Sequence, residues 1–358
     1  MGITSKTENR IVEKINIRQI TSEALSAFLL EHGEKVFRVK QIEQWLWQRG
    51  VTRFDEMTNL SKSTRELLEA HYYIRTPKLT YIQESQDGTT KLGLTLWDGQ
   101  LVETVLIPGR DKATACLSSQ VGCKLRCHFC ATGEMGYHRN LGQDEIFDQV
   151  TLVKRMAEEK GMNFSNIVLM GMGEPLLNYE QVMSAIRVIT SEEGLAMSPY
   201  RVTLSTAGIP EGIRRLADDQ VRFNLAISLH AAIPDLREKL MPISQAYPLP
   251  MLAEAIKYFV EKTGSRPTFE YLLLKDLNDT PEAAKALALY CRQFPVKINI
   301  IEYNPVAGLP YKPSPEKTRD QFIQFLESKN MIVNLRRSKG KDIDAACGQL
   351  ANKNRKLS

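Results

Sequence analysis

Segments typical of buried strands alternate with segments typical of helices along most of the chain, and this alternation constrains the fold more than any other feature. The expected strands are 113–119, 166–171, 201–206, 223–229, 268–274 and 296–303. The expected helices are 143–160, 180–190, 210–217, 235–240 with 249–263, 281–293 and 316–329. Six βα units predict an α/β fold whose parallel sheet forms a closed or open barrel. In such folds the chemistry gathers at the carboxyl ends of the strands.

Three cysteines lie just after the first expected strand at a C-x3-C-x2-C spacing: Cys123, Cys127 and Cys130. Glycines flank them on both sides, so the loop can turn tightly. Three thiolates can hold three corners of a cubane [4Fe–4S] cluster, because cysteine thiolates ligate iron–sulfur centres. No fourth cysteine lies close by, so the fourth iron would stay open to a small chelating molecule. The spacing therefore predicts an iron–sulfur cluster that binds a ligand.

Two other interpretations of these cysteines compete with the cluster. A zinc site of the Cys3His type would use His128 or His138 as its fourth ligand. Structural zinc usually takes its ligands from two separated pairs, and the chain has no second pair. A disulfide framework is disfavoured in a long chain without a secretory signal. Both interpretations account for less of the sequence than the cluster does.

Charge and hydropathy set broad limits on location and partners. Residues 1–18 lack the apolar stretch of a secretory signal, and no apolar run approaches the roughly 18 residues of a membrane span. We therefore expect a cytoplasmic protein with no membrane partner. The net charge is +5, with basic clusters at 336–341 and 353–356. That balance permits an RNA partner without requiring one, since such runs are also common on solvated surfaces.

Small polar residues follow several of the expected strands. The second strand ends in Gly171–Pro175, where glycines allow a ligand to approach the backbone and Glu174 offers a carboxylate to an ammonium group. Ser205, Ser228 with His230, and Asn304 end three other strands. Each could simply cap a strand, but together they could bind ribose hydroxyls, a carboxylate and adenine on one rim.

The two regions before the first βα unit differ in the spacing of their apolar residues. Residues 20–75 show helical spacing and predict a small accessory domain that contacts RNA. Residues 80–108 alternate like a hairpin around Asp98-Gly99. A two-residue loop there places Glu103 opposite Leu94, on the apolar face. A lone carboxylate on such a face is costly unless it is paired or used, whereas at an edge it would reach water. The pattern leaves both possibilities open.

Three further cysteines lie outside the loop. Cys116 is on the first expected strand, and Cys347 lies in the segment Asp342–Leu350 near the end of the chain. Cys291 lies among leucines on an expected helix and is interpreted as a buried core residue. We expect four parts in the chain. They are a helical domain at 1–75, a hairpin extension at 76–110, a barrel at 111–335 and a basic tail at 336–358.

These motifs together resemble the RlmN-type radical S-adenosylmethionine (SAM) RNA methyltransferases. The segments that carry the resemblance are 54–61, 120–133, 139–141, 171–178, 228–230, 303–305 and 345–350, so it covers nearly the whole chain. The resemblance implies a radical SAM partial (β/α)6 barrel with a small N-terminal helical domain. It also implies methylation of carbon 2 of adenosine in 23S rRNA and tRNA.

The resemblance also implies roles for particular residues. Cys123, Cys127 and Cys130 resemble the cluster ligands. The positions similar to SAM contacts are Gly173, Glu174, Ser205, Ser228, Leu229, His230 and Asn304. Cys347 resembles the cysteine that is methylated and delivers the carbon, and Cys116 its partner in a transient disulfide. Glu103 matches the position of a proposed proton acceptor.

The implied reaction uses two SAM molecules per turnover. Cys347 takes a methyl group from the first, and a radical derived from the second activates that methyl group for addition to adenine. Glu103 or Cys116 removes the carbon 2 proton, and Cys116 releases the product by forming a disulfide with Cys347. An external reductant resets the pair, and an electron donor of flavodoxin or ferredoxin type supplies the cluster.

Two alternatives remain at this point. The Cfr-type enzymes methylate carbon 8 of the same rRNA adenosine and share the ending Asp342–Leu350, but they tend to have alanine where this chain has Pro175. A zinc-stabilised RNA-binding protein without catalysis would account for the cysteine loop and the basic tail. It would not account for Gly173, Glu174 or the remote Cys116 and Cys347.

Overall fold

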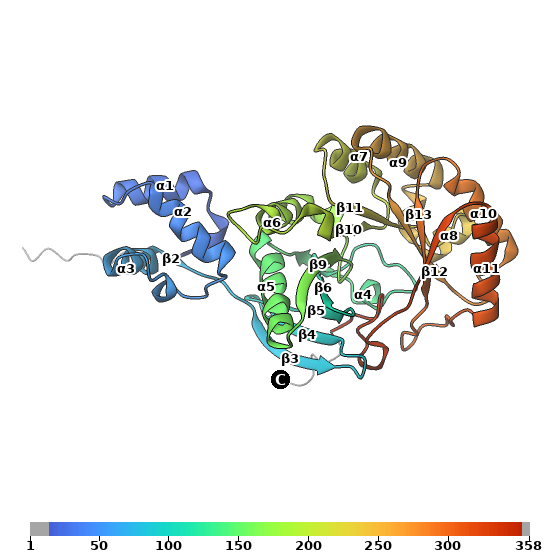
Figure 1. Cartoon of the computed structure of the whole chain (residues 1–358), viewed down its shortest axis with the longest axis horizontal. Helices are drawn as coiled ribbons and strands as arrows, with labels where there is room; N and C mark the ends of the chain where they lie inside the picture. The colour runs from blue at the N-terminus through green and yellow to red at the C-terminus, as the bar shows by residue number, and fades with distance from the viewer. Residues whose placement is uncertain (1–13, 353–358) are drawn as a thin grey trace, which may run out of the picture. The chain divides into compact units, whose positions relative to one another are not determined.

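The computed structural model describes residues 14–352, which form two compact units (Figure 1). The first unit contains the described residues up to Thr76 together with the segment Ser191–Ala196. The second contains Pro77–Thr190 and the residues from Met197 onward. No helix within 14–352 is long and apolar enough to cross a membrane.

The first unit is mostly helical. Its elements are β1 (Ile15–Asn16), α1 (Ser22–Glu31), α2 (Phe37–Glu43), a π-helical turn (Gln44–Gln48), a 3-10 turn (Phe54–Glu56), α3 (Lys62–His71) and β2 (Tyr72–Tyr73). Thr21 and Ser61 cap α1 and α3 by accepting from backbone amides, as hydroxyl residues at helix starts commonly do. Fully buried Leu29, Ile42 and Leu68 pack between the helices.

The second unit is built on one ten-stranded sheet with the order β14-β13-β12-β11-β10-β9-β6-β5-β4-β3. The parallel strands are β6 (Lys112–Cys116), β9 (Asn163–Leu169), β10 (Val202–Thr206), β11 (Asn224–Ser228), β12 (Thr268–Leu273), β13 (Lys297–Glu302) and β14 (Ile332–Arg336). The antiparallel strands β3 (Lys78–Glu84), β4 (Thr90–Thr95) and β5 (Leu101–Pro108) continue the sheet beyond β6. Because β3 and β14 are its two edges, the sheet is an open, partial barrel, as expected.

A helix follows each parallel strand from β6 to β13. These helices are α5 (Gln143–Glu159), α6 (Tyr179–Thr190), α7 (Pro210–Asp218), α8 (Pro234–Leu240) with α9 (Leu249–Thr263), α10 (Pro281–Cys291) and α11 (Glu316–Ser328). Each lies within a few residues of its predicted range. In Figure 1, α7, α9, α10 and α11 follow the outside of the sheet, and the short α4 (Ala131–Glu134) lies on its inner side.

Two strand assignments differ from the prediction. The first expected strand, 113–119, ends at Cys116, and Gln120–Gly122 forms a separate strand, β7, paired with β8 (Tyr137–Asn140). The edge strand β14 was not predicted. Its residues are all exposed or half-buried, so Ile332–Arg336 lacks the apolar run or clean alternation that marks a buried strand.

The predicted register of the hairpin is wrong by one residue. Leu96 donates its backbone N–H to Gln100 O at 2.7 Å, and Gly99 donates to Leu96 O at 3.0 Å with a φ of 75°. The turn is therefore longer than Asp98-Gly99 and ends in a left-handed glycine, an arrangement typical of a bulged hairpin. Glu103 consequently lies opposite Gly93 rather than Leu94. Its side chain therefore lies on the same face as Lys91 and not on that of Leu92 and Leu94.

Candidate active site

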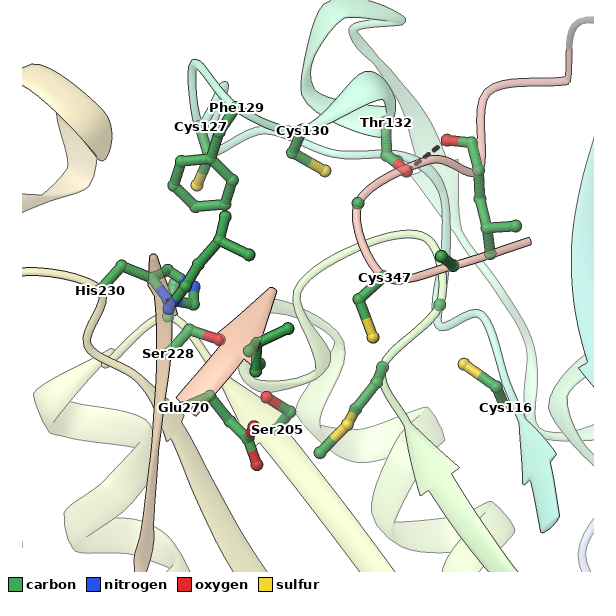
Figure 2. A pocket seen from close by; sticks show the side chains of 18 of the residues that line it. Cys116, Cys127, Phe129, Cys130, Thr132, Ser205, Ser228, His230, Glu270 and Cys347 are labelled. Carbon is green, nitrogen blue, oxygen red and sulfur yellow. Dashed lines mark hydrogen bonds between the residues drawn. The ribbon is translucent and has the colours of Figure 1, made fainter. Parts of the chain in front are cut away.

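A cavity of about 320 Å³ opens at the carboxyl ends of the parallel strands (Figure 2). Most of the predicted site residues line it: Cys116, Cys123, Cys127, Cys130, Gly173, Glu174, Ser205, Ser228, His230 and Cys347. They come from segments that lie far apart in the chain. The sheet thus brings the separate sequence motifs together in one place.

The three-cysteine loop begins at a backbone crossing that only glycine can make. Gly122 has a φ of 74°, and a Cβ there would lie 1.8 Å from Gly136 O. Cys123 donates its N–H to that same carbonyl at 2.9 Å, and Cys130 donates to Cys127 O at 3.1 Å. These bonds fold the loop tightly enough for all three thiols to face the cavity.

The thiols of this loop lie in an apolar pocket. Leu125, Phe129 and Tyr303 belong to the buried cluster against which the cysteines pack. Burial raises the pKa of Cys123 to about 12 and that of Cys127 well above its usual value, and neighbouring negative charges add to both shifts. Such thiols ionise readily only next to a cationic centre, which is the environment that a metal cluster provides.

The donor set fits an iron–sulfur cluster better than a mononuclear zinc site. Within residues 14–352, no three His, Cys, Asp or Glu side chains converge closely enough to hold one metal ion. His128 and His138 are both exposed and do not border the cavity. Neither histidine therefore reaches the cavity wall that the three cysteines line. A cubane, by contrast, needs only three thiolates around a larger inorganic core.

We expect Gly122→Ala to abolish iron incorporation, because the new Cβ would collide with the Gly136 carbonyl at the entrance of the loop. Gly136→Ala is the matched control: its φ is 76°, so the backbone strain is similar, but nothing lies within 4 Å of the added Cβ. Iron per protein after anaerobic reconstitution measures the difference. Equal losses in both variants would show that left-handed strain, not the collision, controls the loop.

Glu174 forms part of the cavity wall after β9. Gly173 has a φ of 98°, and a Cβ added there would lie 2.5 Å from Cβ of Gln120, so only glycine fits at this close approach. The Glu174 carboxylate accepts from Leu176 N at 3.0 Å and from Ala207 N at 2.8 Å. Burial raises the pKa of Glu174 to about 7, against the lowering effect of those amides. A buried carboxylate fixed in this way can receive an ammonium group.

His230 presents a neutral imidazole to the same cavity. Its Nδ1 accepts from Leu272 N at 3.1 Å, so the ring proton resides on Nε2. Burial, together with the charge of Arg237, lowers the pKa of His230 to about 3. The ring packs edge-on against Phe129 at 4.9 Å between centroids. This rigid aromatic pair suits a flat ligand such as a nucleobase.

Cys116 and Cys347 meet across the cavity. Figure 2 shows both sulfur atoms directed into the space between them, and both are free thiols. Burial raises the pKa of Cys116 to about 12, the negative charge of Cys347 adds to the shift, and Arg336 opposes it. The tail therefore folds back so that Cys347 lies over the end of β6.

Three predicted site residues do not line the cavity. Leu229 is fully buried behind it, and Asn304 is buried, donating to Ser338 Oγ at 2.9 Å. Glu103 is 1% exposed and lies in an ion pair with Lys91 at 3.5 Å. The structure thus answers the question left open for Glu103: the carboxylate is paired, and it is not at a solvated edge.

Of the charged residues in the cavity wall, Glu270 was not singled out from the sequence, and Arg336 was noted only as part of the basic cluster 336–341. Glu270 on β12 lies opposite Ser228 in register, and its Oε2 is 3.6 Å from Nη1 of Arg336 on β14. A carboxylate within the otherwise apolar strand Thr268–Leu273 was a usable signal, because burying a charge needs a reason. Arg336 could not be found in this way, since its strand was not predicted.

Comparison with known proteins agrees with this geometry. Residues 15–74 match the family described as "Ribosomal RNA large subunit methyltransferase N-terminal domain", and residues 117–288 match the "Radical SAM superfamily". The second match includes the three-cysteine loop and the glycine-rich strand end. The first match covers the helical unit.

Whole-chain relatives are also found. The "Probable dual-specificity RNA methyltransferase RlmN" of Cytophaga hutchinsonii is 50% identical over 98% of this chain and 95% of its own length. The "Dual-specificity RNA methyltransferase RlmN" of Oleidesulfovibrio alaskensis is 46% identical over 94% of this chain and 96% of its own. A crystal structure of a radical SAM methyltransferase from Sphaerobacter thermophilus superposes with a TM-score of 0.89 at 38% identity. The superposition covers 94% of this chain and 99% of that one.

Proposed function

This chain belongs to the RlmN family of radical SAM methyltransferases, and from that premise we propose that it methylates carbon 2 of adenosine in 23S rRNA and in tRNA. The family resemblance inferred from the sequence motifs is confirmed, and the chain is a SAM-dependent RNA methyltransferase. The observation that carries the proposal is the presence of Cys116 and Cys347 in one cavity with the three-cysteine loop.

Cys123, Cys127 and Cys130 are the proposed ligands of the [4Fe–4S] cluster, and Glu174 the proposed partner of the SAM ammonium. When bound, the cluster would supply the electron for reductive cleavage of SAM. Ser205, Ser228 and His230 border the same cavity and are proposed to hold the ribose and adenine of SAM. Leu229 and Asn304 act from behind the wall, Leu229 by donating its N–H to Glu270 O at 3.0 Å.

Cys347 is the proposed methyl carrier. Its thiolate displaces the methyl group of one SAM: the new bond joins Sγ to carbon, the sulfonium bond breaks, and S-adenosylhomocysteine leaves. This transfer consumes the first of two SAM molecules per turnover. Methylation through a carrier is needed because adenine carbon 2 is electrophilic and cannot itself attack SAM.

Cys116 is the proposed releasing thiol. Its thiolate attacks Cys347 Sγ, a disulfide forms, and the bond between that sulfur and the adenine-linked carbon breaks, with protonation of the carbon giving the methyl product. An external dithiol must then supply two electrons to reduce the disulfide. Cys116 also borders the cavity, whereas Glu103 does not, which favours Cys116 as acceptor of the carbon 2 proton.

The proposed partners follow from the same chemistry. They are 23S rRNA, tRNA and an electron donor of flavodoxin or ferredoxin type, and the proposed location is the cytoplasm. The RNA is expected to present an unstacked adenine, because enzymes that modify a base generally remove it from the stack.

The direct test is nucleoside mass spectrometry after anaerobic reaction of the reconstituted protein with 23S rRNA fragments and tRNA. We expect 2-methyladenosine as the product. The Cys347→Ala protein is the control and should yield none while it still cleaves SAM. Formation of 8-methyladenosine as the main product would place the chain with the Cfr-type enzymes. If the native protein cleaves SAM but methylates neither RNA, the proposal is wrong.

A further inference from the structure

We propose that the buried Lys91–Glu103 ion pair is a latch that holds the loop 344–352, and Cys347 within it, over the cavity. Glu103 is then a positioning residue that acts through the backbone of this loop. The inference deepens the proposed function, because it rests on Cys347 as the methyl carrier. It assigns a purpose to two buried charges that have no place in the cavity wall.

The two charges are deeply buried. The Lys91 side chain is 4% exposed and that of Glu103 1%, with Lys91 Nζ 3.5 Å from Glu103 Oε1. Tyr81 also donates its hydroxyl to Oε1. Removing an ion pair from water is costly, and replacing it with apolar residues is often neutral or stabilising. A pair in this position is therefore weak evidence for stability, and its role is better inferred from what it contacts.

What the pair contacts is the loop on either side of Cys347. Glu103 Oε2 accepts from Ala351 N at 2.9 Å and from Asn352 N at 3.3 Å. Lys91 Nζ donates to Asp344 O at 3.4 Å. Backbone groups before and after the methyl carrier are thus bound to two side chains that are paired with each other.

The centre of the loop rests on the three-cysteine loop. Ala131 donates its N–H to Gly348 O at 2.8 Å, and Thr132 donates its hydroxyl to Leu350 O at 2.7 Å (Figure 2). These two bonds place the loop beside the proposed cluster ligand Cys130. The latch supplies the remaining restraints, from the antiparallel strands on the other side.

The same contacts count against Glu103 as a base in this arrangement. Oε1 is shared between Lys91 and Tyr81, and Oε2 between the two amides. To take a proton from the adenine, Glu103 would have to release the loop that presents the methyl group. Holding the methyl carrier still is the role that is compatible with the contacts, because correct placement of reacting atoms is worth a large part of a rate enhancement.

The test compares Lys91→Met, Glu103→Gln and the double variant. Hydrogen exchange of the 351 and 352 amides is measured by mass spectrometry with and without the cluster. SAM-dependent methylation of Cys347 is followed by intact mass. Each single variant should exchange faster and methylate Cys347 roughly tenfold to a hundredfold more slowly, since a misplacement of about 1 Å can cost a hundredfold. The KM for SAM should stay unchanged, because neither residue lines the cavity.

The double variant leaves no unpaired buried charge, so its stability should return, but it lacks both charged contacts to the loop, so fast exchange and slow methylation should persist. If the single variants acted only by leaving one buried charge unpaired, the double variant would recover native exchange and rate, and the latch would be wrong. Lys160→Met is the matched control. It breaks an ion pair at 2.5 Å between the end of α5 and Glu84 on β3. That pair is substantially exposed and does not contact the loop, so the variant should change neither readout.

Two outcomes distinguish a latch from a catalytic base and from a failure of the carrier role. If Glu103→Gln keeps native exchange and native Cys347 methylation but stalls RNA product formation, Glu103 is a base and the latch is wrong. If the single variants and the double variant all loosen the loop, while even the native protein never methylates Cys347, the latch stands. In that case the proposed carrier role of Cys347 fails.

Discussion

The Cys116→Ala protein is expected to stall with RNA covalently attached to Cys347. After the carbon has joined the adenine, the RNA remains linked to Sγ, and water does not readily break that carbon–sulfur bond. Only a second thiol near Cys347 can release it, and Cys116 is the cavity cysteine that is not a proposed cluster ligand. Turnover should fall by at least about a thousandfold, in line with the loss of a catalytic nucleophile. Methylation of Cys347 itself should persist.

The stalled species should appear as a slowly migrating band on a denaturing gel with labelled RNA. Adding Cys347→Ala to the variant should erase it. Cys291→Ala is a matched control, because Cys291 is also a buried free thiol but lies on α10 outside the cavity. Normal turnover by Cys116→Ala, or a band that survives the loss of Cys347, would reject the two-cysteine mechanism.

The second large effect is expected from Cys127→Ala. Two thiolates cannot hold a cubane firmly, so iron per protein should fall close to background, together with blue-region absorbance and 5′-deoxyadenosine formation. The protein should stay folded, because Cys127 lies in a loop at the ends of the strands and not in the sheet. Circular dichroism would verify the fold.

His128→Ala is the informative control for this experiment. In a Cys3His zinc site, loss of the histidine would remove the metal. His128 is exposed, and its Nδ1 faces Lys239 O at 2.7 Å, so we expect native iron content in that variant. Near-full iron in Cys127→Ala would defeat the assignment of the cluster ligands.

Much of the architecture could be predicted from sequence because each βα unit carries its own signal. Strands such as Val202–Thr206 and helices such as Leu249–Thr263 have the expected local periods. The three-cysteine spacing was equally local, and the rim position of Glu174 followed from its place after a strand. These features depend on neighbouring residues and on the general rule for parallel sheets.

What could not be predicted depends on long-range pairing. The position of Glu103 was set by one left-handed glycine in a turn, which shifted a whole strand by one residue and replaced Leu94 with Gly93 as its partner. The contact between Glu103 and Ala351 joins residues far apart in the chain, and no local period encodes it. The place of Arg336 in the cavity wall was missed because its edge strand has no strong apolar pattern.

The segment Ser191–Ala196 has a consequence for how this enzyme can be taken apart. It lies in the sequence between α6 and β10 but belongs to the helical first unit, where Gln48 donates to Glu192 O at 2.7 Å. The chain therefore passes between the units three times, and the first unit is not a contiguous N-terminal segment that can be removed by one cut. A truncation near residue 76 would leave Ser191–Ala196 in the remaining protein without the residues that it contacts in the first unit. A chimera that exchanges the helical unit between relatives should therefore replace both of its segments together. Otherwise a loss of activity would reflect the lost contacts of Ser191–Ala196 and not the specificity of the transferred unit.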